Sequence, residues 1–326
     1  MESRSVVVTG ATGFIGGAVA RHLVARGLRV TALHQRAAPL PQGRGIVWKT
    51  WEEWERGSER AVALVHAAAV RHRHGVPAER YGRENIDLSA RLLAAAPGRV
   101  GRFVDVSSIA VFGWPRTLPI DDAFPFAPVG PYGMSKVATE EAVRRSGLPY
   151  VIVRPSITYG PGDTNGMIDK LLRLVRDGAY RDVGSGRSRV QLVYSEDLAH
   201  AIAEAALRPG IEGSEFTCTY REPIEMRELS RLAAEAVGRP LPRMKVPYPV
   251  AWAAAVGFEA LEAAGVKFHA GEPPVTREKL QTVTVDRAYR IDRMREVLGW
   301  EPPTGYAEGL QKTAAAFRPV SVSRPT

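Results

Sequence analysis

The feature that most constrains the fold is a β-branched stretch that runs directly into a glycine-rich turn near the start of the chain. Ser5–Thr9 has the composition of a buried parallel strand, and residues 18–26 have the apolar spacing of a helix. Between them lie Gly10, Gly13 and Gly16. Glycines in such a turn let backbone amides approach a pyrophosphate at the helix N-terminus. The stretch predicts a dinucleotide-binding unit; the alternative is a tight turn that binds nothing.

The end of the second predicted strand, residues 28–33, indicates which dinucleotide is bound. An NAD site usually places a carboxylate there, on the ribose 2′-hydroxyl. No Asp or Glu occurs between Arg29 and Glu52, and the strand is followed by His34, Gln35 and Arg36. A guanidinium pairs well with a 2′-phosphate. We therefore expect NADP(H) in preference to NAD(H), unless Arg36 is simply one more exposed arginine.

Strands and helices alternate through the first half of the chain. Further strands are predicted at residues 46–48, 61–65, 102–107 and 150–154, with helices between them. This alternation is typical of an α/β fold with a doubly wound parallel sheet of the Rossmann type.

The second half has a different character, with several predicted helices and few strands. We expect residues 1–155 to form the dinucleotide-binding domain, with 187–218 returning to it. Residues 156–186 and 219–317 would form a smaller, mostly helical substrate lobe, and 318–326 a disordered tail.

Two polar or small stretches follow predicted strands at the edge where such sheets bind ligands. The small residues after His66 would let a cofactor lie close to the backbone, and Ser108 directly follows the fifth strand.

Tyr132 and Lys136, four residues apart, share one face of a helix that begins near Pro131. An ammonium beside a phenol stabilises phenolate, so that the phenol can exchange a proton with a carbonyl or alcohol.

Composition excludes several classes of protein. The net charge of +9 comes from scattered arginines and not from a basic block with aromatics, which argues against nucleic-acid binding. Cys218 is the single cysteine, so no internal disulfide forms, and with no export signal expected we predict a cytoplasmic protein.

The run from Arg71 to His74 lacks carboxylate or cysteine partners, so a basic loop is a better interpretation than a metal site.

These segments together resemble the extended short-chain dehydrogenases/reductases over nearly the whole chain. The matching residues are 9–16, 66–69, 85, 106–113, 132–136, 154–162, 193–197 and 298–302. Residues 247–265, 273–277 and 286–299 are most similar to the 3β-hydroxysteroid dehydrogenase-like branch, whose members act on sterols, lipid-like ketones and related apolar alcohols.

The resemblance implies roles for individual residues. Tyr132 would be the general acid/base, Lys136 its activator and a ligand of the nicotinamide ribose, and Ser108 the residue that orients the carbonyl. Asn85 matches the asparagine of the family's catalytic tetrad. The expected cofactor contacts are Gly10, Thr12, Gly13, Phe14, Ile15, Gly16, Arg36, His66, Ala67, Ala68, Tyr132, Lys136 and Pro155, and no metal is expected.

The leading hypothesis is an NAD(P)H-dependent ketoreductase or alcohol dehydrogenase for a bulky, largely apolar ketone or secondary alcohol. One alternative is a sugar-nucleotide epimerase or 4-ketoreductase, with Arg187 or Arg189 on a phosphate. Dehydration is disfavoured, because Ser107 and Ser108 stand where a dehydratase carries an Asp-Glu pair. The other alternative is a non-catalytic NADP(H)-sensing protein. The resemblance also implies a homodimer.

The helix predicted at residues 249–264 is apolar on one side. We expect that side to pack over the substrate pocket rather than to rest on a membrane, and we expect no stable membrane insertion.

Overall fold

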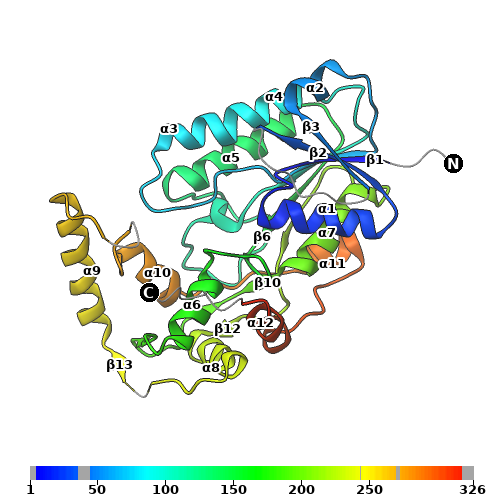
Figure 1. Ribbon diagram of the computed structural model, residues 1–326. Helices are drawn as coiled ribbons and strands as arrows, with labels where there is room; N and C mark the ends of the chain where they lie inside the picture. The colour runs from blue at the N-terminus through cyan, green and yellow to red at the C-terminus, as the bar shows by residue number, and fades with distance from the viewer. Residues whose placement is uncertain (1–4, 36–44, 243, 269–271, 318–326) are drawn as a thin grey trace, which may run out of the picture.

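The computed structural model describes residues 5–35, 45–242, 244–268 and 272–317. Its centre is a seven-stranded parallel sheet in the order β11-β6-β5-β4-β1-β2-β3, with helices on both faces (Figure 1). The predicted class, a doubly wound α/β fold with a helical C-terminal part, is confirmed. The strands of this sheet are β1 (Ser5–Thr9), β2 (Arg29–His34), β3 (Ile46–Thr50), β4 (Ala63–His66), β5 (Phe103–Val106), β6 (Tyr150–Pro155) and β11 (Ser214–Cys218).

Helices on one face of the sheet come from the first half of the chain, and those on the other face from both halves. The first face carries α2 (Trp51–Arg56), α3 (Ala78–Tyr81), the π-helical turn η1 (Gly82–Asp87), α4 (Leu88–Ala95) and α5 (Gly130–Arg145). The second carries α1 (Phe14–Ala25), α7 (Ser195–Leu207) and α11 (Asp292–Leu298). The 3₁₀ turn η2 (Ile109–Phe112) follows β5.

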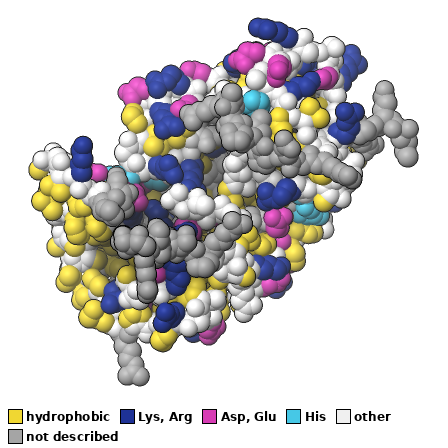
Figure 2. Space-filling model, in the orientation of Figure 1, with side chains coloured by type: hydrophobic (Ala, Val, Ile, Leu, Met, Phe, Trp, Pro, Cys, Tyr) yellow, Lys and Arg dark blue, Asp and Glu magenta, His cyan; other side chains and the backbone are white. Residues whose placement is uncertain are grey.

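The smaller lobe lies beyond the ligand-binding edge of the sheet (Figure 1). Its helices are α6 (Met167–Arg176), α8 (Met226–Val237), α9 (Tyr248–Ala263), α10 (Arg277–Thr284) and α12 (Tyr306–Ala315). Its short strands are β7 (Ile157–Tyr159), β8 (Asp182–Val183), β9 (Arg189–Val190), β10 (Leu192–Tyr194), β12 (Ile224–Glu225) and β13 (Lys245–Val246). Hydrophobic side chains gather on the surface over α9 (Figure 2).

The domain boundaries expected from the sequence agree with only some of these elements. Within residues 187–218, β11 is a strand of the main sheet and α7 packs against that sheet, whereas β10 pairs with β7 in a separate two-stranded sheet. In the range assigned to the lobe, α11 packs against the main sheet, because Met294, Val297 and Leu298 lie in its core. The predicted tail at 318–326 lies outside the described residues.

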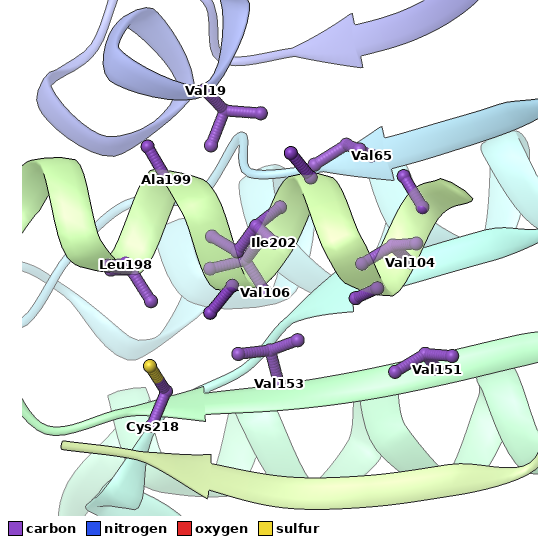
Figure 3. Packing of buried hydrophobic residues seen from close by; sticks show 14 of the residues in the cluster. Val19, Val65, Val104, Val106, Val151, Val153, Leu198, Ala199, Ile202 and Cys218 are labelled. Atoms are coloured by element: carbon purple, nitrogen blue, oxygen red, sulfur yellow. The ribbon is translucent and has the colours of Figure 1, made fainter. Parts of the chain in front are cut away.

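The core of the sheet domain is built from alternating side chains of the strands. Val104 and Val106 point toward α7, and Val151 and Val153 of the neighbouring strand lie beside them (Figure 3). Cys218 is buried in the same cluster (Figure 3), and burial raises the pKa of its thiol, which suits a core residue rather than a nucleophile.

None of the helices in the described ranges combines the length and the apolar character needed to cross a bilayer.

Candidate active site

The turn between β1 and α1 is shaped by its glycines. Gly10 has φ +70, and a Cβ there would stand 2.7 Å from the backbone nitrogen of Ala68, so no larger residue fits. Gly16 lies directly against the backbone of Gly10. Gly13 is the N-cap of α1 without a side-chain cap, and the first turn of α1 carries no acidic residue. The first-turn amides are therefore free of an internal anion and fit a pyrophosphate.

A cavity of about 650 Å³ opens beside this turn. That volume lies within the range of small-molecule sites. Its lining includes Gly10, Thr12, Gly13, Ala67 and Ala68, five of the predicted cofactor contacts, together with Leu33, His34 and Gln35 at the end of β2. These lining residues fit a dinucleotide. Arg36, on which the preference for NADP(H) depends, lies outside the described residues.

His66, another predicted contact, has its side chain engaged inside the protein. Its Nδ1 lies 2.9 Å from Thr9 Oγ1 and its Nε2 lies 2.8 Å from Ser89 Oγ. Because Ser89 donates its hydroxyl hydrogen to the carbonyl of Asn85, His66 Nε2 must be the donor and Nδ1 the acceptor. Burial, helped by the charge of Lys136, lowers the pKa of His66 to about 3. Any contact of His66 with a cofactor would therefore come through its backbone.

The first two turns of α5 carry Tyr132 and Lys136, as the spacing predicts. Lys136 is buried, and its Nζ donates a 2.8 Å hydrogen bond to the carbonyl of Val106, the last residue of β5. This bond holds the ammonium at the carboxyl end of the central strands. Tyr132 is half-buried, and its ring is covered by the rings of Tyr81 and His72, with centroids 6.1 and 6.2 Å away.

The two serines after β5 have different surroundings. Ser107 is buried and donates a 2.5 Å hydrogen bond to Glu140 Oε1, so its hydroxyl is bound inside the protein. Ser108 is half-buried and accepts a 3.1 Å bond from the amide of Ala110, which leaves its hydroxyl hydrogen available. The arrangement is consistent with Ser108, and not Ser107, as the group that orients a carbonyl.

Gly133, which sequence reasoning did not single out, brings these two segments together. A Cβ at this position would stand 2.8 Å from the carbonyl oxygen of Ala110. The first turn of α5 therefore lies directly against η2, one residue from Tyr132 on one side and two from Ser108 on the other. In the sequence, the glycine directly after Tyr132 is the feature that could have indicated this close contact.

Asn85 joins three segments. Its Oδ1 accepts from the amide of Val70 at 2.7 Å, and its Nδ2 donates to the carbonyl of Val70 and to Ser135 Oγ. The side chain lies in the π-helical turn η1, a feature frequent at functional sites. Asn85 thus fixes the loop after β4 against α5, beside Tyr132 and Lys136.

Asp105 is a second residue that sequence reasoning missed. It lies on β5 opposite His66 of β4, fully buried, and neither carboxylate oxygen has a hydrogen-bond partner among the described residues. Burial raises its pKa to about 7, against the attraction of Lys136. A buried carboxyl with a raised pKa therefore lies beneath the helix that carries Lys136.

The basic run after β4 connects the site to the lobe. Arg71 lies 3.3 Å from Asp163, His72 pairs with Glu278 of α10, and His74 lies 2.9 Å from Glu262 of α9. The carboxylate of Glu278 raises the pKa of His72. Each of these partners comes from a different segment of the lobe, which is why the sequence could not reveal them. Arg71, His72, His74 and Glu278 line a cavity of about 360 Å³. His72 also contacts the ring of Tyr132.

Within the described ranges, no three His, Cys, Asp or Glu side chains are grouped closely enough to share a metal ion. The remaining predicted contacts, Phe14, Ile15 and Pro155, lie at the start of α1 and at the end of β6. They surround the same edge of the sheet.

The chain belongs to the NAD dependent epimerase/dehydratase family, which its residues 6–215 match. Together with the fold, this makes it an extended short-chain dehydrogenase/reductase, as the motifs indicate.

Curated relatives span nearly the whole chain. A 2-alkyl-3-oxoalkanoate reductase from Stenotrophomonas maltophilia (strain K279a) is 29% identical, over 95% of this chain and 98% of its own. A UDP-glucose 4-epimerase from Vibrio cholerae is 27% identical, over 96% and 95%. A 3beta-hydroxysteroid-dehydrogenase/decarboxylase (isoform 1) from Arabidopsis thaliana is 26% identical, over 96% and 80%. The relatives thus include reductases, dehydrogenases and epimerases.

Among solved structures, MoeE5 in complex with UDP-glucuronic acid and NAD superposes with a TM-score of 0.76 at 21% identity. The match covers 96% of this chain and 98% of MoeE5. At this identity the likeness establishes the fold alone.

Proposed function

We propose that the protein is an NAD(P)H-dependent reductase of a bulky, largely apolar ketone, or the dehydrogenase of the corresponding secondary alcohol. One observation carries the proposal: the close contact of Gly133 with Ala110 brings the turn of Tyr132 against the turn of Ser108. Both lie at the sheet edge that holds the glycine turn of a dinucleotide site.

In this reaction a bound nicotinamide supplies the hydride. Tyr132 donates a proton from its phenol oxygen to the carbonyl oxygen of the substrate. Ser108 Oγ donates a hydrogen bond to the same oxygen and fixes its position. Lys136, one turn further along the same helix and held by the carbonyl of Val106, supplies the positive charge that stabilises the phenolate during proton transfer. The rings of Tyr81 and His72 contact the tyrosine ring and hold it in place.

The preference for NADP(H) is supported by sequence. The cavity is lined at the end of β2 by His34 and Gln35, neither of which is a carboxylate, and Arg36 follows. The test is the affinity for NADPH and for NADH, measured by fluorescence titration of wild type and Arg36→Ala. A loss of NADPH affinity of at least about tenfold, with NADH unchanged, is expected for one charge-assisted contact. An unaltered preference contradicts the role of Arg36.

The apolar substrate class rests on the resemblance to the steroid-dehydrogenase branch and on the names of two relatives, which act on an alkyl oxoalkanoate and on a hydroxysteroid. The test is a panel of ketones at fixed NADPH: 3-keto acids with alkyl branches, 3-ketosteroids and small polar ketones. We expect turnover to rise with apolar bulk. Faster reduction of the small polar ketones would contradict the substrate class.

A second candidate is a sugar-nucleotide epimerase or 4-ketoreductase, which is favoured by the epimerase relative and by the UDP-sugar in MoeE5. Under this hypothesis UDP raises the melting temperature in the presence of cofactor, by mass action on the folded state. Under the leading proposal UDP leaves it unchanged and an apolar ketone raises it. If the protein binds cofactor but neither reduces any ketone nor epimerises any sugar nucleotide, the remaining hypothesis is a non-catalytic NADP(H)-sensing protein.

A further inference from the structure

Helix α9 presents an apolar face to solvent. Only Ala251 and Ala255 are buried, against Leu280 and neighbouring valines of the lobe. The expectation that the large apolar side chains pack over the pocket is therefore wrong for most of them. We define the α9 face as the exposed large apolar side chains of this helix: Tyr248, Val250, Trp252, Val256 and Leu261. Val250 is 58% exposed and Trp252 46%. The helix stands at the margin of the molecule (Figure 1), where hydrophobic side chains gather on the surface (Figure 2).

The charged residues of α9 point the other way. Its only two are Glu259 and Glu262. Glu259 accepts hydrogen bonds from the amide and Nε of Arg277 at 2.8 and 2.6 Å, and Glu262 accepts from His74. A surface helix normally turns its apolar stripe inward and its charges outward. Here the arrangement is reversed, so the α9 face is built to be covered.

The dimensions of the helix argue against a second copy of the chain as the cover. α9 has 16 residues. A helix of that length is about 24 Å long and about 10 Å wide, which gives a face on the order of 250 Å². A stable protein interface needs about 800 Å² on each partner. A helix that lies in the boundary between lipid head groups and acyl chains needs no such area, because each apolar side chain contributes separately.

The charges that flank the α9 face suit a lipid surface. Lys245 precedes the helix and Lys267 follows it, and both are exposed. Tyr248 and Trp252 have the amphipathic rings that favour the membrane interface. The chain as a whole carries a net charge of +9. We propose that the α9 face docks the protein on the surface of a bilayer that contains anionic lipids.

The same helix is tied to the candidate active site. Glu262 holds His74, and His72, two residues before, covers Tyr132 and pairs with Glu278 of α10. Docking would bring the cavity between this loop and the lobe close to the bilayer, where apolar ketones dissolve. The docking itself needs no turnover, so it is tested separately from the proposed reaction.

The experiment is sedimentation of the full chain with vesicles of phosphatidylcholine alone and of phosphatidylcholine with phosphatidylglycerol in equal parts. The wild type is expected to bind the anionic vesicles, more weakly as salt rises. The triple variant Val250→Ser, Trp252→Ser, Val256→Ser is expected to lose at least about tenfold in vesicle affinity, since burial of each such side chain is worth a factor of that size. Lys245→Glu with Lys267→Glu is expected to weaken binding to anionic vesicles only.

The matched control is Val47→Ser with Leu174→Ser, which removes side chains of similar exposure, 44% and 46%, at other sites. It is expected to bind vesicles like the wild type. Circular dichroism and cofactor affinity show that each variant is folded. Vesicle binding that is absent in the wild type, or equal in the triple variant, overturns the proposal. A dimer in light scattering that the triple variant dissociates, without vesicle binding, would assign the face to a second copy instead.

Discussion

Arg154 and Arg277 each pair with a glutamate, but one pair lies inside the sheet domain and the other on the lobe. The Arg154 side chain is 1% exposed and donates through Nε and Nη2 to Glu140 at 2.9 and 2.8 Å, with Glu215 as a further partner. The Arg277 side chain is 60% exposed and pairs with Glu259 at 2.6 Å. The sheet domain thus contains buried charges beside the candidate catalytic residues, whereas this pair between α9 and α10 of the lobe is exposed to solvent.

The two pairs differ in what they hold in place. Glu140 also accepts from Ser107, so the buried pair of charges fixes the strand end that precedes Ser108 and the helix that carries Tyr132. The loop from Arg71 to His74 reaches the lobe through three pairs, in each of which at least one partner is partly exposed to solvent. We therefore expect the proposed reaction to depend on the buried contacts of the sheet domain, and access to the site to depend on the exposed contacts of the loop.

The largest expected effect breaks the buried pair. Arg154→Ala removes the buried guanidinium that pairs with Glu140 and leaves this carboxylate with the half-buried Arg144 as its charged partner. The loss of the buried partner should lower the free energy of unfolding by about 3 kcal/mol, the lower end expected for a broken buried pair. Arg277→Ala removes an exposed pair and should cost about 0–1 kcal/mol. Urea unfolding of both variants measures the difference, and equal losses would remove the contrast between the two halves.

The next effect separates the two serines after β5. Ser108→Ala removes a donor to the developing oxyanion and should reduce kcat about 10²–10³-fold, with a loss of stability of no more than about 1 kcal/mol from the bond to the Ala110 amide. Ser107→Ala removes the hydrogen bond to Glu140 and should cost about 1–3 kcal/mol in unfolding while kcat stays near wild type. The reverse pattern, measured by ketone reduction and urea unfolding, would exchange their roles.

The third effect uses two buried groups on neighbouring strands. The native pKa of Asp105 is about 7, above its unfolded value of 3.8, so its contribution opposes folding increasingly as pH rises from about 4 to 7. The native pKa of His66 is about 3, below 6.5 when unfolded, so its contribution opposes folding as pH falls below about 6.5.

Asp105→Asn should therefore stabilise the protein more at pH 8 than at pH 5, by a few kcal/mol at most, since each tenfold change in an acid dissociation constant corresponds to about 1.4 kcal/mol. His66→Gln should reduce the loss of unfolding free energy that occurs as the pH falls below about 6.5. The measurement is urea unfolding across about pH 3–8, which includes the native and unfolded pKa values of both groups. A difference between Asp105→Asn and wild type that does not change with pH would contradict the raised pKa of this carboxyl.

The sheet domain could be predicted from sequence because its signals are local. The glycine turn, the spacing of Tyr132 and Lys136 and the serine after β5 each report on neighbours within a few residues. The partners of the basic loop could not be predicted, because they are distant in sequence: Asp163 is 92 residues from Arg71, and Glu262 is 188 residues from His74. The exposed face of α9 differs from the sequence prediction for a related reason. Its apolar pattern predicts burial, but among the described residues only Leu280 and its neighbouring valines pack against the helix in an apolar cluster.

The central claim is that the phenol of Tyr132 transfers the proton while the hydride comes from the nicotinamide. The most direct test is transfer of deuterium from 4-deuterated NADPH to an apolar ketone, followed by mass spectrometry of the alcohol, in wild type and Tyr132→Phe, with Tyr81→Phe as the matched control. The account predicts label on the carbinol carbon in wild type and control, and a rate about 10²–10⁴-fold lower in Tyr132→Phe at unchanged cofactor affinity. Label transfer at the wild-type rate in Tyr132→Phe would contradict it.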